Sequence, residues 1–214
     1  MTPDEVEAMF TRSDGQFAFA RWARPVAPVI FGLADEAMPA VKGALELVAA
    51  VAGRGLAETD PELGANFLVF FLQDWDELRG VPGIDDLLPD LPGLLERLSA
   101  AEAARYRSFR FEPSGAIKAH FSFLRLDAAT RALPAEAVGL SLALQGMLLW
   151  SDTAFDSSSP LAELPDDGGT ILRPEIANLL RAAYDPVLPD TGSDPALALR
   201  LQARASLGVG AVPQ

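Results

Sequence analysis

His120 is the only histidine of this 214-residue chain, and there is no cysteine. Disulfides, thiolate metal sites, cysteine nucleophiles and metal sites made of several histidines are therefore all excluded. Around His120, the residues Ile117, Phe121 and Phe123 alternate with polar side chains. This alternation predicts a strand on which His120 points away from the face of the phenylalanines. We expect a surface or hydrogen-bonded structural histidine, with a functional histidine as the alternative.

Ser141 lacks the surroundings of a nucleophilic serine. Its neighbours are Leu140 and Leu142, without the glycines of a nucleophile elbow. A serine in an apolar helix is expected to bond back to the preceding turn. The glycines at 53–55 and 168–169 lack the Lys-Ser/Thr pair that a phosphate cradle needs, so we interpret them as loop or helix-stop glycines.

Acidic residues occur in small groups, and carboxylate oxygens suit Ca²⁺ or Mg²⁺. None of the groups follows the spacing of a calcium-binding loop, so solvated surface acids are expected. We predict no metal site and no cofactor, and keep metal binding by surface acids as one hypothesis. The acids are Asp74, Asp76, Glu77, Asp85, Asp86, Asp152, Asp156, Asp166 and Asp167.

The overall charge limits the partners. A net charge of −13 and a pI near 4.4 oppose encounter with nucleic acid and with anionic membrane surfaces. The most apolar stretch, 138–150, is shorter than the roughly 20 residues of a membrane span. The acidic start of the chain shows no signal peptide, so a cytoplasmic protein is expected. A protein partner or self-association stays open.

Helices that would position these residues follow from apolar spacing, from proline near a start and from glycine after an end. The run at 134–149 is apolar on nearly every side and predicts a helix buried in the core. Helices are predicted over 3–10, 38–52, 93–106, 134–149, 173–185 and 194–207.

Strands are predicted between these helices. The continuous apolar run 66–72 is typical of a central strand covered on both faces. Pro25 and Pro28 make 17–31 an edge or irregular strand, 107–112 and 116–126 form a hairpin, and 151–170 is a long loop. The order predicts one α+β domain over 1–214, with a mixed sheet packed against helices and a flexible tail at 208–214.

Three short segments follow the pattern of a known family. They are Arg-Trp-Ala-Arg-Pro-Val at 21–26, Ala-Asn-Phe-Leu-Val-Phe at 65–70 and Leu-Leu-Arg-Ala-Ala-Tyr-Asp-Pro at 179–186. From Phe17 to Pro189 the chain resembles the bacterial domain of unknown function 2927, which is related to zincin-type metallopeptidases. The resemblance implies a zincin-like fold.

The same resemblance implies a degenerate active site. The family has a helix with Glu-Glu-x-x-Gln, then Gly-Leu-x-x-Asp and a serine-rich loop. Aligned on Gln145 and Asp152, this chain has Ser141 and Leu142 in place of the two glutamates and Leu148 in place of the glycine. Leucine cannot accept a proton, and serine and a neutral amide are poor zinc ligands. Zinc peptidase activity is therefore not expected, and no catalytic residue is assigned.

Two main hypotheses of function follow. The first is a non-catalytic domain of zincin-like fold that acts by binding or assembly, with Ser141, Leu142, Gln145 and Asp152 at the former active-site positions. The alternative is an enzyme with an unconventional site, in which His120 works with Asp152 or Asp156. An apolar, filled contact between His120 and the helix of Gln145 favours the first hypothesis, whereas a polar cleft there favours the second.

Overall fold

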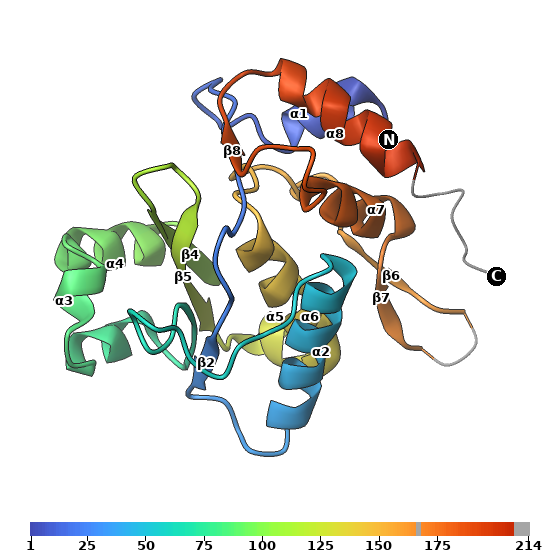
Figure 1. Cartoon of the computed structure of the whole chain (residues 1–214). Coiled ribbons are helices and arrows are strands. Elements are labelled where there is room, and N and C mark those ends of the chain that lie inside the picture. The colour runs from blue at the N-terminus through green and yellow to red at the C-terminus, as the bar shows by residue number, and fades with distance from the viewer. Residues whose placement is uncertain (166–167, 208–214) are drawn as a thin grey trace.

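A computed structural model of the chain describes residues 1–165 and 168–207 (Figure 1). The tail expected at 208–214 and the acids Asp166 and Asp167 lie outside the described residues. The prediction of an α+β fold with a mixed sheet packed against helices is confirmed. The strand order is β2 (Pro28–Phe31), β3 (Phe67–Leu72), β5 (Ile117–Arg125) and β4 (Arg105–Phe111), of which the first three are parallel and β4 is antiparallel to β5.

A row of aromatic rings fixes the register of the four-stranded sheet. Phe31, Phe70, Phe123 and Tyr106 are direct cross-strand partners on β2, β3, β5 and β4. Neighbouring ring centroids are 4.9, 4.9 and 6.0 Å apart, and all three pairs are stacked. Cross-strand aromatic pairs stabilise a sheet beyond the area that they bury. A slip of one residue would move every ring to the opposite face, so this row specifies the pairing.

Helices cover both faces of the sheet, which explains why the apolar run of β3 is buried on both sides. On one face the core includes Phe121 and Phe123, under the 3₁₀ helix η1 (Trp75–Gly80), α3 (Ile84–Leu87) and α4 (Leu91–Ala100). Phe67, Val69 and Phe71 lie in the core of the opposite face, with α2 (Met38–Val51), α6 (Ala135–Met147) and α7 (Pro174–Ala183).

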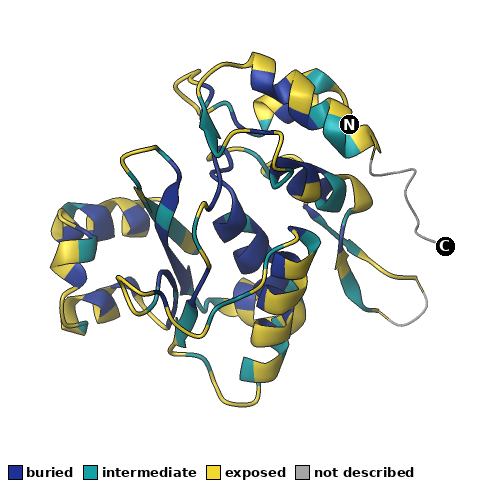
Figure 2. Ribbon diagram, viewed as in Figure 1, coloured by how far each residue is buried: buried dark blue, intermediate teal, exposed yellow. Residues whose placement is uncertain are grey.

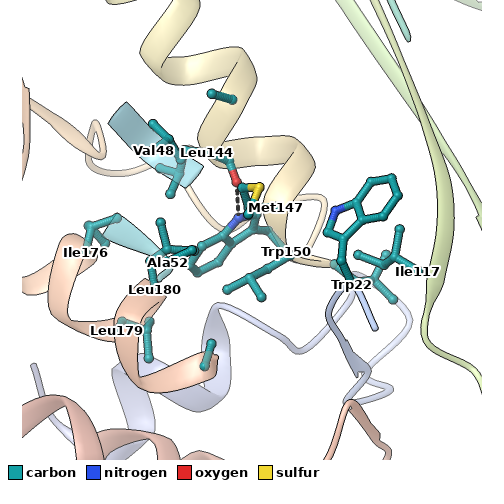
Figure 3. Packing of buried hydrophobic residues seen from close by; sticks show 14 of the residues in the cluster. Trp22, Val48, Ala52, Ile117, Leu144, Met147, Trp150, Ile176, Leu179 and Leu180 are labelled. Carbon is teal, nitrogen blue, oxygen red and sulfur yellow. Dashed lines mark hydrogen bonds between the residues drawn. The ribbon is translucent and has the colours of Figure 1, made fainter. Parts of the chain in front are cut away.

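The prediction that the apolar helix lies in the core is confirmed. Every residue of α6 from Val138 to Leu144 is buried, and the helix lies in the middle of the molecule (Figure 2). Gly139 lets α2 come close, since a methyl group there would meet the Cβ of Ala44 at 2.8 Å. Beyond the helix, Trp150 packs beside Met147 and its ring nitrogen donates a 2.8 Å hydrogen bond to the carbonyl of Leu144 (Figure 3).

The two ends of the described chain lie together. Helix α1 (Pro3–Ala8) packs against α8 (Ala196–Leu207), and β1 (Phe19–Ala20) pairs with β8 (Thr191–Gly192) (Figure 1). No helix in the described part of the chain is both long and apolar enough to cross a membrane.

Two predicted boundaries are wrong. The helix predicted over 93–106 ends at Ala100, because Glu102 adopts a left-handed backbone (φ 49°) and the chain turns into β4. The loop predicted over 151–170 contains β6 (Leu161–Glu163), which pairs with β7 (Thr170–Leu172). A short helix, α5 (Ala128–Arg131), also connects β5 to α6.

Candidate functional site

A pocket of about 370 Å³ lies between the edge strand β4, helix α6 and the loop that follows the helix. Three of the positions singled out from the sequence line it, namely Leu142, Gln145 and Asp152, and the fourth, Ser141, touches it through hydrogen bonds. The structure therefore brings all four together. The complete lining is Arg105, Tyr106, Arg107, Ser122, Leu142, Gln145, Ser151, Asp152, Phe155 and Asp156.

Ser141 joins the helix wall of the pocket to its strand wall. Its Oγ accepts a hydrogen bond from Nε2 of Gln145, one turn further along α6, at 2.9 Å. The same oxygen accepts one from Nη1 of Arg105 on β4, at 3.0 Å. The expectation that Ser141 bonds back to the preceding turn is wrong, because its hydroxyl makes hydrogen bonds only to these two side chains among the described residues.

Arg107 is the most deeply placed cation of the pocket. Its guanidinium donates to the carbonyls of Gln145 (3.4 Å), Trp150 (2.9 Å) and Ser151 (2.6 Å). Burial lowers the pKa of Arg107 to about 10; the charge of Asp152 opposes this and that of Arg12 adds to it. Partial burial also lowers the pKa of Arg105, and the charge of Asp127 opposes this.

Neither arginine has a carboxylate at ion-pair distance among the described residues. Other described cations, such as Arg12 and Arg110, also lack an ion pair, but Arg105 and Arg107 occur together in the lining of one pocket. Sequence reasoning missed both residues. Arg105, Arg107 and Phe109 alternate along the sequence, so in a strand they lie on one face. The helix predicted over 93–106 includes the first of these residues, and the alternation was therefore not recognised as a strand.

Asp152 anchors the loop after α6 to the N-terminal turn. One carboxylate oxygen accepts from the amide of Ser13 at 3.0 Å, and the other accepts from its hydroxyl at 2.6 Å. These hydrogen bonds lower the pKa of Asp152. A second hollow, of about 420 Å³, lies next to the first and shares Arg105, Tyr106, Arg107 and Asp152 with it. Arg12 also lines this second hollow.

His120 lies behind the pocket and does not line it. Its ring packs against Phe67 and Phe109, with centroids 4.8 and 4.6 Å away, and the side chain is fully buried. The predicted face is confirmed, since His120 points away from Phe121 and Phe123 and toward α6. The expectation of a surface position for His120 is wrong, because α6 covers this face of the sheet.

Neither ring nitrogen of His120 has a hydrogen-bond partner among the described residues. The backbone of Ser108 favours the protonated form of the ring and so raises the pKa, but this effect is smaller than that of burial. Burial is the main cause that lowers the pKa of His120 to about 3, and Arg107 contributes by charge repulsion. The contact with α6 is filled: a methyl group on Gly146 would meet Cδ2 of His120 at 2.6 Å and the ring of Phe67 at 2.3 Å.

The segments that carry the family resemblance hold the end of α6 in place. The ring nitrogen of Trp22 donates to the carbonyl of Gly146 at 2.8 Å, and the hydroxyl of Tyr184 donates to the carbonyl of Met147 at 2.6 Å. Burial raises the pKa of Tyr184, so its phenol stays protonated and can donate. These two bonds satisfy carbonyls that the helix end leaves open and fix the turn that carries Gln145.

Arg21 ties Tyr184 and its neighbours into the same arrangement, which we call the Arg21 clamp (Arg21, Trp22 and residues 183–190). The guanidinium of Arg21 donates to the carbonyls of Ala183 (2.8 Å), Asp185 (3.2 Å) and Leu188 (2.9 Å), and to the carboxylate of Asp190 (2.7 Å). It also lies 5.6 Å from the centre of the Tyr184 ring. A single buried side chain therefore fixes the whole turn after α7.

Within residues 1–165 and 168–207, no group of three or more histidine, aspartate or glutamate side chains lies close enough together to hold a metal ion. A comparison of the chain with protein-family models, with curated proteins and with solved structures gave no match in any of the three. The resemblance to domain of unknown function 2927 and to zincins stays a prediction.

Proposed function

We propose that this chain is a non-catalytic binding domain, whose ligand carries a negative charge and occupies the pocket between β4 and α6. The observation that carries the proposal is the pair Arg105 and Arg107, which present cationic guanidinium groups to one pocket without a carboxylate partner. Guanidinium groups bind carboxylate and phosphate oxygens through paired N–H donors. An anion bound here would give the two guanidinium groups the carboxylate or phosphate oxygens that no described residue supplies at ion-pair distance.

The position of His120 supports binding over catalysis. A histidine base must reach the proton that it removes, directly or through one water. His120 is closed off by Phe67, Phe109 and Gly146, and its depressed pKa keeps it neutral. The filled contact between β5 and α6 is the arrangement expected for a domain without a histidine-based site.

The zincin-like character belongs to the same proposal. In that interpretation Ser141 and Gln145 stand where a zinc peptidase holds metal, and both now serve the hydrogen-bond bridge to Arg105. The former active site would have become a ligand pocket. A cytoplasmic location and an absence of nucleic-acid partners accompany this proposal, on the grounds of the acidic charge of the chain.

The test is a titration of the ¹⁵N-labelled full chain with acetate and with inorganic phosphate, followed by NMR. We expect saturable shifts that are confined to β4, the end of α6 and the loop carrying Asp152. Arg105→Gln should weaken the binding of the anion by about fivefold or more, the effect of losing one charged contact.

Arg79→Gln is the matched control, because Arg79 is an exposed arginine of η1 whose ion pair is with Asp76 alone. It should leave the titration unchanged. Shifts that do not saturate, or an Arg105→Gln variant that binds like the parent, would contradict the proposed function.

A further inference from the structure

Resting on the proposed function, we propose further that the ligand is a zwitterion, namely an α-amino acid with an apolar side chain. The pocket is lined by side chains of both charges. Arg105 and Arg107 come from β4, whereas Asp152 and Asp156 come from the loop after α6. The lining therefore offers donors for an anionic group from one element and acceptors for a cationic group from another.

The two aspartates disfavour a ligand that is only anionic. A dianion large enough to bridge the pocket would bring negative charge toward Asp152 and Asp156, and like charges at short range repel. The formal charges of the four side chains cancel, so the best complement is a ligand that is neutral as a whole but divided into two charged ends. An α-carboxylate and an α-ammonium group meet this requirement.

The carboxylates have capacity to accept an ammonium group. A carboxylate offers about four acceptor positions, and Asp152 uses three of them for the amide and hydroxyl of Ser13 and the hydroxyl of Ser151. The side chain of Asp156 has no hydrogen-bond or ion-pair partner among the described residues and faces the same pocket. Asp156 is therefore the main acceptor for the ammonium group, and Asp152 adds charge beside it.

The other residues that line the pocket determine the size and polarity of the ligand that it can hold. Leu142 and Phe155 give the pocket an apolar part. Its volume of about 370 Å³ is near the lower end of the roughly 300–1,000 Å³ that is usual for small-molecule sites. A single amino acid of the size of leucine suits this space better than a cofactor or a long peptide.

Isothermal titration of the full chain with three related probes separates the parts of this proposal. L-Leucine has both charges, N-acetyl-L-leucine keeps only the carboxylate, and L-leucinamide keeps only the ammonium group. We expect L-leucine to bind, and both derivatives to bind about fivefold more weakly or worse, since each loses one charged contact.

Two variants assign the contacts. Asp156→Asn should weaken L-leucine about fivefold but leave N-acetyl-L-leucine unchanged or slightly tighter, whereas Arg105→Gln should weaken both. Asp86→Asn, on the exposed side of α3, is the control and should change neither.

Equal or tighter binding of N-acetyl-L-leucine by the parent would overturn the zwitterion while leaving an anion-binding domain. Failure of all three probes, together with failure of acetate and phosphate, would overturn the proposed function as well. Failure of the three leucine probes alone would overturn only the amino-acid ligand.

Discussion

Arg105 donates a hydrogen bond from Nη1 to the Oγ of Ser141 at 3.0 Å, and so connects the edge strand of the sheet to the most buried helix. Gln145 donates to the same oxygen from the next turn of α6. The hydroxyl group of Ser141 thus fixes the side chains of Arg105 and Gln145 relative to each other. Its removal would affect stability and the shape of the pocket together.

Ser141→Ala should lower the free energy of unfolding by about 1–2 kcal/mol, because Ser141 is buried and two donors lose their shared acceptor. The loss stays moderate since the guanidinium of Arg105 can turn to water. Chemical denaturation measures the change, and Ser99→Ala on the exposed side of α4 is the control, expected within about 0.5 kcal/mol of the parent. A Ser141→Ala variant as stable as its control would show that the bridge contributes nothing.

Leu142→Ala should cost about 2–5 kcal/mol through lost burial and the cavity that it leaves. The side chain is 5% exposed and belongs to the larger core. Leu47→Ala offers a matched comparison, because Leu47 lies on α2 with 48% of its surface exposed and should cost below about 1 kcal/mol. Urea unfolding of both variants should reproduce this order, and equal costs would mean that the wall of the pocket collapses freely around the smaller residue.

Gly146→Ala should destabilise the protein by about 1–3 kcal/mol or more, because the added methyl group would overlap the rings of Phe67 and His120. Gly43→Ala makes the same change on the exposed face of α2, where a methyl group meets nothing within 4 Å. There alanine should stabilise the helix by about 0.5–1 kcal/mol. Thermal melts that shift in the same direction for both variants would contradict the packing of α6 against β5.

The stability of the fold should depend on pH through His120. The unfolded histidine titrates near about 6.5, whereas burial lowers the pKa of His120 in the folded chain to about 3. Between these values the unfolded chain binds a proton that the folded chain does not. Stability is therefore complete above pH 6.5 and falls as the pH decreases, by up to about 1.4 kcal/mol per pH unit.

His120→Leu should remove this slope. The comparison is clean from pH 7 down to about 4.5, before the carboxylates with lowered pKa, those of Asp60, Glu62, Asp127 and Asp152, begin to take up protons in both proteins. Denaturant midpoints measured at intervals across this range give the two slopes. Parallel slopes for parent and variant would mean that the imidazole gains a proton without leaving its buried site.

The main elements of the fold could be predicted because their signals are local. The run from Phe67 to Leu72 is apolar without interruption, which is typical of a strand with helices on both faces. The turn at Glu102 carries no such signal, since a left-handed backbone usually falls to glycine. Because that signal is missing, the sequence predicts a helix that runs on to Tyr106, across the start of β4.

The candidate site could be predicted only on its helix side. Ser141 and Gln145 are one turn apart, so their pairing follows from helix geometry. Arg105 and Arg107 reach the same pocket through the pairing of β4 with β5 and the packing of α6, which no local pattern encodes. For His120, the alternation of apolar and polar residues around it predicts the correct face of the strand. It does not predict that the side chain is buried, because α6, a helix that follows later in the chain, covers this face.

The Arg21 clamp also imposes an order on the assembly of the molecule. Arg21 belongs to the first tenth of the chain, yet its four acceptors lie 162 to 169 residues later. Because a ribosome synthesises a chain from its N-terminus, the guanidinium of Arg21 cannot form these four hydrogen bonds until Asp190 has been synthesised. Closing so long a loop is slow, and the last turn of α6 gains its final support from Tyr184 only then. The strands and helices that precede α7 are therefore synthesised before the contacts that fix the last turn of α6, next to the pocket, can form.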